Sequence, residues 1–221
     1  MVIPRPITGT YRSRKNVASV LLLALLFSLP FIRIGGDPLV LLDIPARKFH
    51  IFGLTIWPQE LHLLHMLLII GGLSLFFFTA LFGRLWCGYA CPQTIFTELY
   101  DHVARLAGGS SYGKKHSSRI WWRVYPAWIV LSILLSFIYL SYFRPFEELA
   151  LDLAVLNVFP EGTPAPWAIA FLGLTVFSFV NAAYFRENVC KYVCPYGRFQ
   201  TALLDQHSPI VSYTLKRGEP R

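Results

Sequence analysis

Residues 87–92 read Cys-Gly-Tyr-Ala-Cys-Pro, and residues 190–195 read Cys-Lys-Tyr-Val-Cys-Pro. These two copies of a Cys-x-x-x-Cys-Pro motif contain all four cysteines of the chain. Three residues between the thiols place them at i and i+4 on one face of a helix, where both sulfurs can reach a common metal ion or cluster. The predicted catalytic, cofactor-binding and metal-binding residues are therefore Cys87, Cys91, Cys190 and Cys194.

The similarity between the two copies extends beyond the cysteines. In each copy a phenylalanine follows the second cysteine by five positions, and an aspartate comes soon after. These residues are Phe96 and Asp101 in the first copy, and Phe199 and Asp205 in the second. A repeat of this length predicts two related structural units, each carrying half of the site.

The chain as a whole is too apolar for an ordinary soluble domain. Of its 221 residues, 55% are hydrophobic and only 14% are charged, and the mean hydropathy is +0.50. This composition indicates a membrane protein with the lipid bilayer as its surroundings. The net charge of +8 is then better explained by basic cytoplasmic loops than by nucleic acid, and no nucleic-acid partner is predicted.

Four apolar runs approach or reach the roughly 20 residues that a helix needs to cross a bilayer. They cover residues 17–32, 61–82, 124–143 and 167–185. We therefore predict an all-α integral membrane protein with four transmembrane helices. The helices form two parallel hairpin repeats, each followed by a Cys-x-x-x-Cys-Pro motif and a short interfacial helix.

The basic residues predict the orientation of these helices. Sixteen of the twenty Lys and Arg residues precede the first crossing, follow the second within 84–123, or follow the fourth from 186 onward. The positive-inside rule places these segments in the cytoplasm. Both termini and both cysteine motifs are then expected on the cytoplasmic side.

The expected organisation is a single membrane domain, 1–221. Its segments are the cytoplasmic N-terminus (1–16), the first hairpin repeat with its motif (17–106), a cytoplasmic loop (107–123), the second hairpin repeat with its motif (124–205) and a cytoplasmic tail (206–221).

The spacing of the cysteines leaves the identity of the metal open. Bacterial ferredoxins end their cluster-binding run with Cys-x-x-x-Cys-Pro, which makes an iron–sulfur cluster one option. Soft thiolates also select Cu(I). Structural zinc is a weaker alternative because its sites more often use other spacings, and a transient, catalytic disulfide is compatible with a reducing cytoplasm.

Two histidines near the start of the second crossing form a further candidate site. His62 and His65 lie at i and i+3, and ionisable side chains in a crossing are functional candidates for copper, a quinone or a haem. The plainer interpretation, which we favour, is that both side chains form hydrogen bonds at the membrane interface. His50 is expected at the surface of the outer loop.

Four stretches carry a resemblance to the CcoG/FixG family, and the resemblance extends over nearly the whole chain. They are Trp-Cys-Gly-Tyr-Ala-Cys-Pro-Gln at 86–93, Cys-Lys-Tyr-Val-Cys-Pro-Tyr-Gly-Arg-Phe-Gln at 190–200, Pro-Ala-Arg-Lys-Phe-His-Ile-Phe-Gly-Leu-Thr-Ile-Trp-Pro-Gln at 45–59, and the final Lys-Arg-Gly-Glu-Pro-Arg. The resemblance implies a redox accessory protein of the bacterial inner membrane that reduces Cu(II) to Cu(I) for assembly of a cbb-type cytochrome c oxidase. It also implies a 4Fe-4S cofactor and cbb-type oxidase assembly factors as partners.

Members of that family continue beyond the Arg-Gly-Glu-Pro-Arg segment into a ferredoxin-type domain. The resemblance therefore implies that this chain corresponds to the membrane-embedded N-terminal part without that domain. Electrons would then come from a donor such as a ferredoxin-like domain or protein, or a quinol. Two alternatives stay open, namely an iron–sulfur electron-transfer subunit of a quinol dehydrogenase and a non-redox assembly scaffold with a structural metal.

Overall fold

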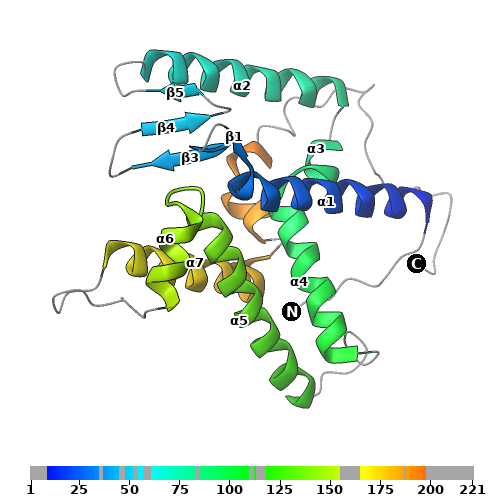
Figure 1. Cartoon of the computed structure of the whole chain (residues 1–221). Helices are drawn as coiled ribbons and strands as arrows, with labels where there is room; N and C mark the ends of the chain where they lie inside the picture. The colour runs from blue at the N-terminus through cyan, green and yellow to red at the C-terminus, as the bar shows by residue number, and fades with distance from the viewer. Residues whose placement is uncertain are drawn as a thin grey trace.

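The computed structural model describes residues 9–34, 37–44, 48–51, 54–56, 61–82, 85–109, 112, 118–154, 165–186 and 188–197. Most of these residues are helical (Figure 1). The helices are α1 (Thr10–Ser28), continued by the 3₁₀ turn η1 (Leu29–Phe31), α2 (Leu61–Phe82), α3 (Leu85–Tyr89), α4 (Pro92–Gly108), α5 (Ser118–Leu140), α6 (Phe146–Ala154) and α7 (Pro166–Val180). Two π-helical turns follow α7, η5 (Asn181–Phe185) and η6 (Val189–Val193).

Three of the predicted crossings coincide with helices that are long and apolar enough to span a bilayer. These candidate spans are Thr10–Phe31, Ile120–Leu140 and Pro166–Phe185. The second predicted crossing is helical over its whole predicted range as α2. Among the residues whose side chains the structure describes, its apolar part is His65–Phe78. A multi-pass membrane protein follows from the three candidate spans, while the four-helix hairpin repeat stays a prediction.

The all-α prediction treats residues 33–60 as a loop, but the described residues between 33 and 56 form five short strands. β1 (Arg33–Ile34) pairs with β2 (Asp37–Pro38), and β3 (Val40–Asp43), β4 (Lys48–Ile51) and β5 (Leu54–Ile56) form an antiparallel meander. Polar and apolar residues alternate along β4, which is the pattern of a strand with one covered face. Figure 1 shows the meander between α2 and α6.

A small core holds α4 and η5 against α5. Its buried residues are Tyr100, Ala104, Tyr112, Val124, Trp128, Leu135 and Ala182. The Nε1 of Trp128 donates to the carbonyl oxygen of Tyr100 at 3.0 Å, and the Tyr100 hydroxyl lies 2.7 Å from the Ser132 hydroxyl. Buried Trp and Tyr side chains need such partners for their polar ends, so these bonds fix the register of α4 on α5.

The helix that follows the first motif packs lengthwise against α5. Near the start of α4 the Phe96 ring lies 5.8 Å from the ring of Tyr139, and further along the Tyr100 ring lies 6.2 Å from that of Trp128. The expected interfacial helix therefore exists as α4, but it runs along a candidate span instead of lying free beside one end of it.

The ends of the first and third predicted crossings, with the loops that follow them, meet at one end of the molecule. The Leu42 amide donates to the Tyr142 carbonyl oxygen at 2.7 Å, and Arg33 forms a 2.9 Å ion pair with Glu147. The rings of Phe31 and Phe146 lie 4.8 Å apart. Both loops were predicted on the same side of the membrane, and these contacts agree with a common location.

Candidate functional site

The first cysteine motif links α3 to α4. Cys87 lies in α3, and Cys91 is the residue immediately before α4, with Pro92 in its first turn. The backbone of Cys91 is extended, with φ −63° and ψ 123°, as expected for a residue that precedes proline. Its amide donates to the Trp86 carbonyl oxygen at 2.9 Å, and the Thr94 hydroxyl donates to the carbonyl oxygen of Cys87 at 2.8 Å.

The second motif repeats this backbone geometry. Cys194 has φ −70° and ψ 112° and again precedes a proline, and its amide donates to the Val189 carbonyl oxygen at 2.8 Å. In each motif the second cysteine thus bonds the residue just before the first cysteine, five positions earlier. The hydrogen bond at each second cysteine thus spans one residue more than an α-helical bond, as in a π-type turn, a feature frequent at functional sites.

A close backbone approach within the second motif requires glycine at position 197. A Cβ atom there would lie 2.9 Å from the carbonyl oxygen of Cys190, which is closer than such contacts allow. In the first motif, a Cβ atom on Gly88 would meet no atom within 4 Å. An alanine would therefore fit at Gly88, in the first motif, but not at Gly197, two positions after the second.

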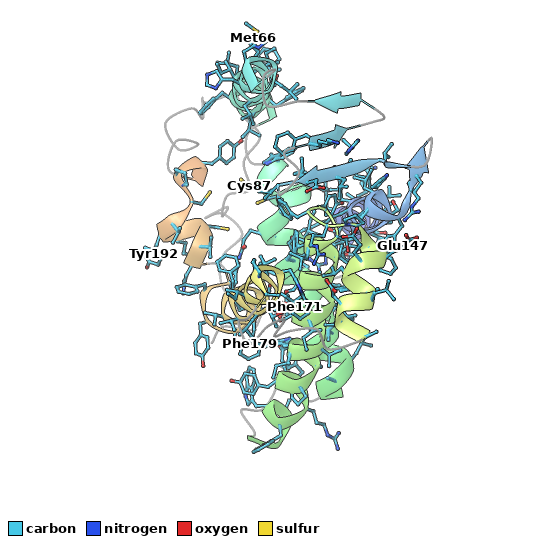
Figure 2. All side chains as sticks on the ribbon, turned by 60° about the vertical axis from the view of Figure 1, so that its left-hand side comes forward. Met66, Cys87, Glu147, Phe171, Phe179 and Tyr192 are labelled. Carbon is cyan, nitrogen blue, oxygen red and sulfur yellow. The ribbon has the colours of Figure 1, made fainter. Side chains whose placement is uncertain are left out.

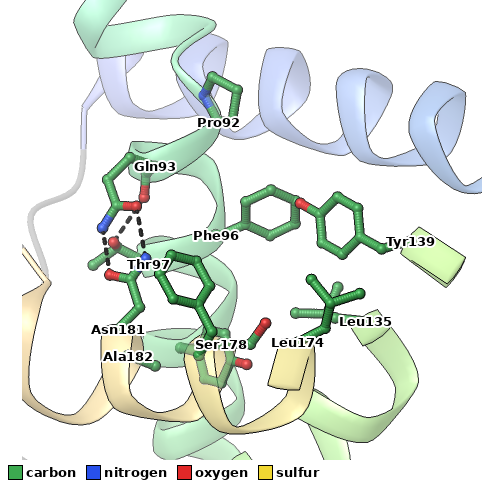
Figure 3. Close-up of a pocket in the computed structure, with 12 residues that line it drawn as sticks. Pro92, Gln93, Phe96, Thr97, Leu135, Tyr139, Leu174, Ser178, Asn181 and Ala182 are labelled. Carbon is green, nitrogen blue, oxygen red and sulfur yellow. Dashed lines mark hydrogen bonds between the residues drawn. The ribbon is translucent and has the colours of Figure 1, made fainter. Parts of the chain in front are cut away.

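An amide pair joins the start of α4 to the chain before the second motif (Figure 3). Gln93 Nε2 donates to Asn181 Oδ1 at 2.9 Å, and Asn181 Nδ2 donates to Gln93 Oε1 at 3.1 Å. Gln93 Nε2 also donates to the Arg186 carbonyl oxygen at 3.0 Å. Gln93 stands two positions after Cys91, and Arg186 four positions before Cys190, so these bonds bring the flanks of the two motifs together.

A buried ion pair strengthens the same connection. Arg186 Nη2 contacts the Asp101 carboxylate of α4, and both residues are only 8% exposed. The Tyr112 hydroxyl donates to the Asp101 carboxylate at 3.4 Å. Burial raises the pKa of the Tyr112 phenol, and the nearby Asp101 charge raises it further, so Tyr112 stays protonated. Arg186 has a positive φ of 39°, which a non-glycine residue rarely adopts.

The four thiols have the right chemistry for a metal centre but are not assembled into one. None of them forms a disulfide; Cys190 is exposed and the other three are half-buried. Figures 1 and 2 show η6 near α3, which carries Cys87. Four thiols are the usual ligand set of an iron–sulfur cluster. Within the described ranges, however, no three His, Cys, Asp or Glu side chains gather closely enough to hold a metal ion.

The histidine candidates lie away from the cysteine motifs. His62 and His65 are exposed on α2, and His50 lies in β4 opposite Leu41 and Thr55. Because the described part of the chain shows no metal-binding group around them, the interfacial interpretation of His62 and His65 stays the plainer one.

The sequence-based interpretation missed Gln93, Asn181 and the buried role of Arg186. Gln93 follows the first Cys-Pro directly, which is the one local signal available for it. Asn181 is a polar residue at the end of an apolar run, and Arg186 looked like an ordinary basic residue after a crossing. Their partners are 85 to 93 positions away in the chain, so local patterns could not reveal them.

Two family models match the chain, and each contains one cysteine motif. A 4Fe-4S binding domain matches residues 64–108, which include Cys87 and Cys91. A 4Fe-4S dicluster domain matches residues 185–221, which include Cys190 and Cys194. These matches support an iron–sulfur cofactor.

The chain is similar over its whole length to three curated bacterial proteins. Protein RdxA of Cereibacter sphaeroides is 36% identical over 234 residues, an alignment that covers 100% of this chain and 49% of RdxA. Protein RdxB of the same organism is 32% identical, with 100% of this chain and 48% of RdxB covered. Nitrogen fixation protein FixG of Rhizobium meliloti is also 32% identical, with 100% and 44% covered.

The chain spans about half the length of these curated relatives. No solved structure matches it significantly. The three candidate spans, the two 4Fe-4S matches and the relatives together define the class as a membrane protein related to redox chemistry. Within that class the chain is FixG- and Rdx-like, which bears out the FixG part of the predicted resemblance.

Proposed function

We propose that this chain is the membrane part of a FixG/Rdx-type electron-transfer protein. In this proposal the ligands of an iron–sulfur cluster are Cys87, Cys91, Cys190 and Cys194. One observation carries the proposal: the two 4Fe-4S family matches each contain one Cys-x-x-x-Cys-Pro motif. The common backbone turn of the two motifs supports it, because equal turns present their cysteines in the same way. A 4Fe-4S cluster bound there would accept and donate single electrons.

The residues around the motifs have definite roles in this proposal. Thr94 holds the carbonyl group of Cys87, and Gln93 ties the first motif to the backbone that leads into the second. The buried Arg186 places a positive charge close in sequence to Cys190 and pairs with Asp101. Together these contacts would hold the flanks of the motifs in fixed positions while electrons pass.

For the reaction itself we propose one-electron reduction of Cu(II) to Cu(I). Cu(I) prefers soft thiolate ligands, and the exposed Cys190 offers a thiol at the surface. The resemblance of residues 45–59 to the CcoG/FixG family is the basis for a proposed role in copper supply to a cbb-type cytochrome c oxidase. In this proposal, copper is the substrate, and an electron donor and oxidase assembly factors are partners.

We further propose that the protein lies in a bacterial inner membrane with both termini and both cysteine motifs on the cytoplasmic side. The distribution of Lys and Arg supports this orientation, since sixteen of twenty fall in the segments assigned to the cytoplasm. The meeting of the two predicted outer loops near Tyr142 is in keeping with it.

The proposal is tested on anaerobically purified protein in which one motif at a time is changed, as Cys87→Ser with Cys91→Ser, or Cys190→Ser with Cys194→Ser. We expect the broad visible absorption and the electron paramagnetic resonance of the reduced cluster to disappear in both variants. Reduction of Cu(II), followed with a Cu(I)-specific chelator and a chemical electron donor, should fall to background. The matched control is Gly88→Ala, which alters the first motif without removing a thiol and meets no neighbouring atom.

Two results would overturn parts of the proposal. A colourless protein that contains zinc would replace the cluster with a structural metal and favour an assembly scaffold. A coloured protein that reduces Cu(II) equally well in the wild type and in the cysteine variants would remove copper reduction from the motifs.

A further inference from the structure

A cavity of about 330 Å³ lies between α4, α5 and α7 (Figure 3). It begins at Pro92 and Gln93, which directly follow Cys91. Its volume is at the lower end of the roughly 300–1,000 Å³ that small-molecule sites occupy. The cavity is therefore large enough for one ring-sized ligand next to the first motif.

The walls of the cavity are mainly apolar and aromatic. Phe96 and Tyr100 of α4, Leu135 and Tyr139 of α5, and Leu174 of α7 line it. Phe177, which also lines it, is 67% exposed and lies on a candidate membrane span. This side of the cavity therefore lies at the surface that the span would present to lipid.

Hydrogen-bond donors lie on opposite sides of this apolar space. Figure 3 shows Tyr139 on one side and Asn181 on the other, with Phe96 between them. Asn181 donates one of its two amide hydrogens to Gln93. In the described part of the structure, the Tyr139 and Ser178 hydroxyls have no hydrogen-bond partner that would occupy them as donors. Polar groups in apolar surroundings are costly without partners.

We propose that this cavity binds the head group of a lipid-soluble quinone. A quinone ring is planar and apolar on its faces, which suits the aromatic walls, and its two opposite carbonyl oxygens accept hydrogen bonds from donors on opposite sides of the cavity. Its apolar tail leaves toward the lipid past Phe177. A lipid acyl chain fits the apolar walls but has no acceptors for the hydroxyl groups.

The proposal goes beyond the proposed function, because it concerns binding and needs no cluster. It assigns one class of ligand to the cavity between α4, α5 and α7, beside the first motif. Loss of the cluster and loss of quinone binding are therefore separate outcomes. A variant with all four cysteines replaced by serine should still bind the quinone.

The test is photolabelling of the full chain in phospholipid nanodiscs with an azido-substituted short-chain ubiquinone. We expect saturable labelling that unlabelled decylubiquinone competes away, located by mass spectrometry in peptides from α4, the end of α5 and residues 174–182. Leu174→Trp fills the cavity and should raise the decylubiquinone concentration needed for half-maximal competition about tenfold. Tyr139→Phe keeps the aromatic ring but removes one hydrogen-bond donor, and should raise the same decylubiquinone concentration several-fold.

The matched control is Leu172→Trp, the same change two positions earlier on α7, where the leucine is 65% exposed and does not line the cavity. Equal thermal unfolding of the two tryptophan variants excludes misfolding as the cause of a difference. The proposal would be overturned if decylubiquinone failed to reduce the labelling. It would also be overturned if Leu174→Trp and Leu172→Trp were labelled equally. Labelling that only phospholipid competes would assign the cavity to an acyl chain instead.

Discussion

Arg186 shows how far a single residue can depart from its sequence pattern. In the sequence it is one of six basic residues after the fourth predicted crossing, and positive-inside reasoning treats it as a solvated charge. In the structure it is 8% exposed, has a positive φ and contacts Asp101, 85 positions earlier. The repeat of an aspartate after each motif pointed to Asp101, but its partner depends on how η5, which precedes Arg186, packs against α4.

Removal of Asp101 should be costly because it leaves a charge without its partner. In Asp101→Asn the Arg186 guanidinium stays buried without a counter-charge, so we expect the free energy of unfolding to fall by about 3–5 kcal/mol. The measurement is equilibrium unfolding in mixed micelles with increasing denaturing detergent. The double variant Asp101→Asn with Arg186→Gln should be less destabilised than the sum of the two single changes.

Glu98 provides the matched control for this ion pair. It lies on the same helix and pairs with Arg12 and Lys15 at 2.5 and 2.7 Å, but these side chains are partly exposed. Glu98→Gln should therefore cost only about 0–1 kcal/mol. Equal losses at positions 98 and 101 would contradict the assignment of Asp101 and Arg186 as a buried pair.

At the scale of elements, helix ends marked by proline were predictable and non-local contacts were not. The fourth predicted crossing, 167–185, matches the candidate span Pro166–Phe185 closely, because an apolar run starts at a proline that suits a first turn. Strands β3 to β5 were missed because 33–60 was interpreted only as a loop. The sequence also predicted α4, but not that this helix would lie along α5.

The turn common to both motifs makes a prediction about glycine. Gly197→Ala places a methyl group 2.9 Å from the Cys190 carbonyl oxygen, so the second turn must open. Overpacking of this kind costs about 1–3 kcal/mol, and we expect lower iron content per chain, measured by atomic emission after anaerobic purification. Gly88→Ala, which has open space around it, should keep the iron content of the wild type. A full iron content in Gly197→Ala would contradict the close approach.

At the scale of the whole molecule, composition and basic loops predicted a membrane protein, and three candidate spans support it. What they did not predict is the packing. Figure 1 shows α2 apart from α4, α5 and α7, and many side chains of α1 and α2 are exposed apolar groups, such as Leu67, which is 63% exposed. Lipid has the same apolar character as these surfaces, so hydrophobicity alone does not decide which helices touch.

The proposed orientation in the inner membrane predicts which exposed side chains a reagent can reach from outside. In a cysteine-free variant, Leu151→Cys on α6 should react with a membrane-impermeant maleimide in intact spheroplasts. Leu106→Cys on α4 should react only after permeabilisation. The two leucines are 65% and 78% exposed, which makes them a matched pair. The reverse pattern would contradict the cytoplasmic assignment of the end of α4.

Whether the four cysteines bind one cofactor together is tested most directly by the iron and sulfide content of the protein. Iron and acid-labile sulfide are measured per chain in anaerobically purified protein and in the two variants that each lack one cysteine pair. A single shared 4Fe-4S cluster predicts about four of each per wild-type chain and nearly none in either variant. Iron and sulfide that stay at the wild-type level after removal of either pair would contradict the account.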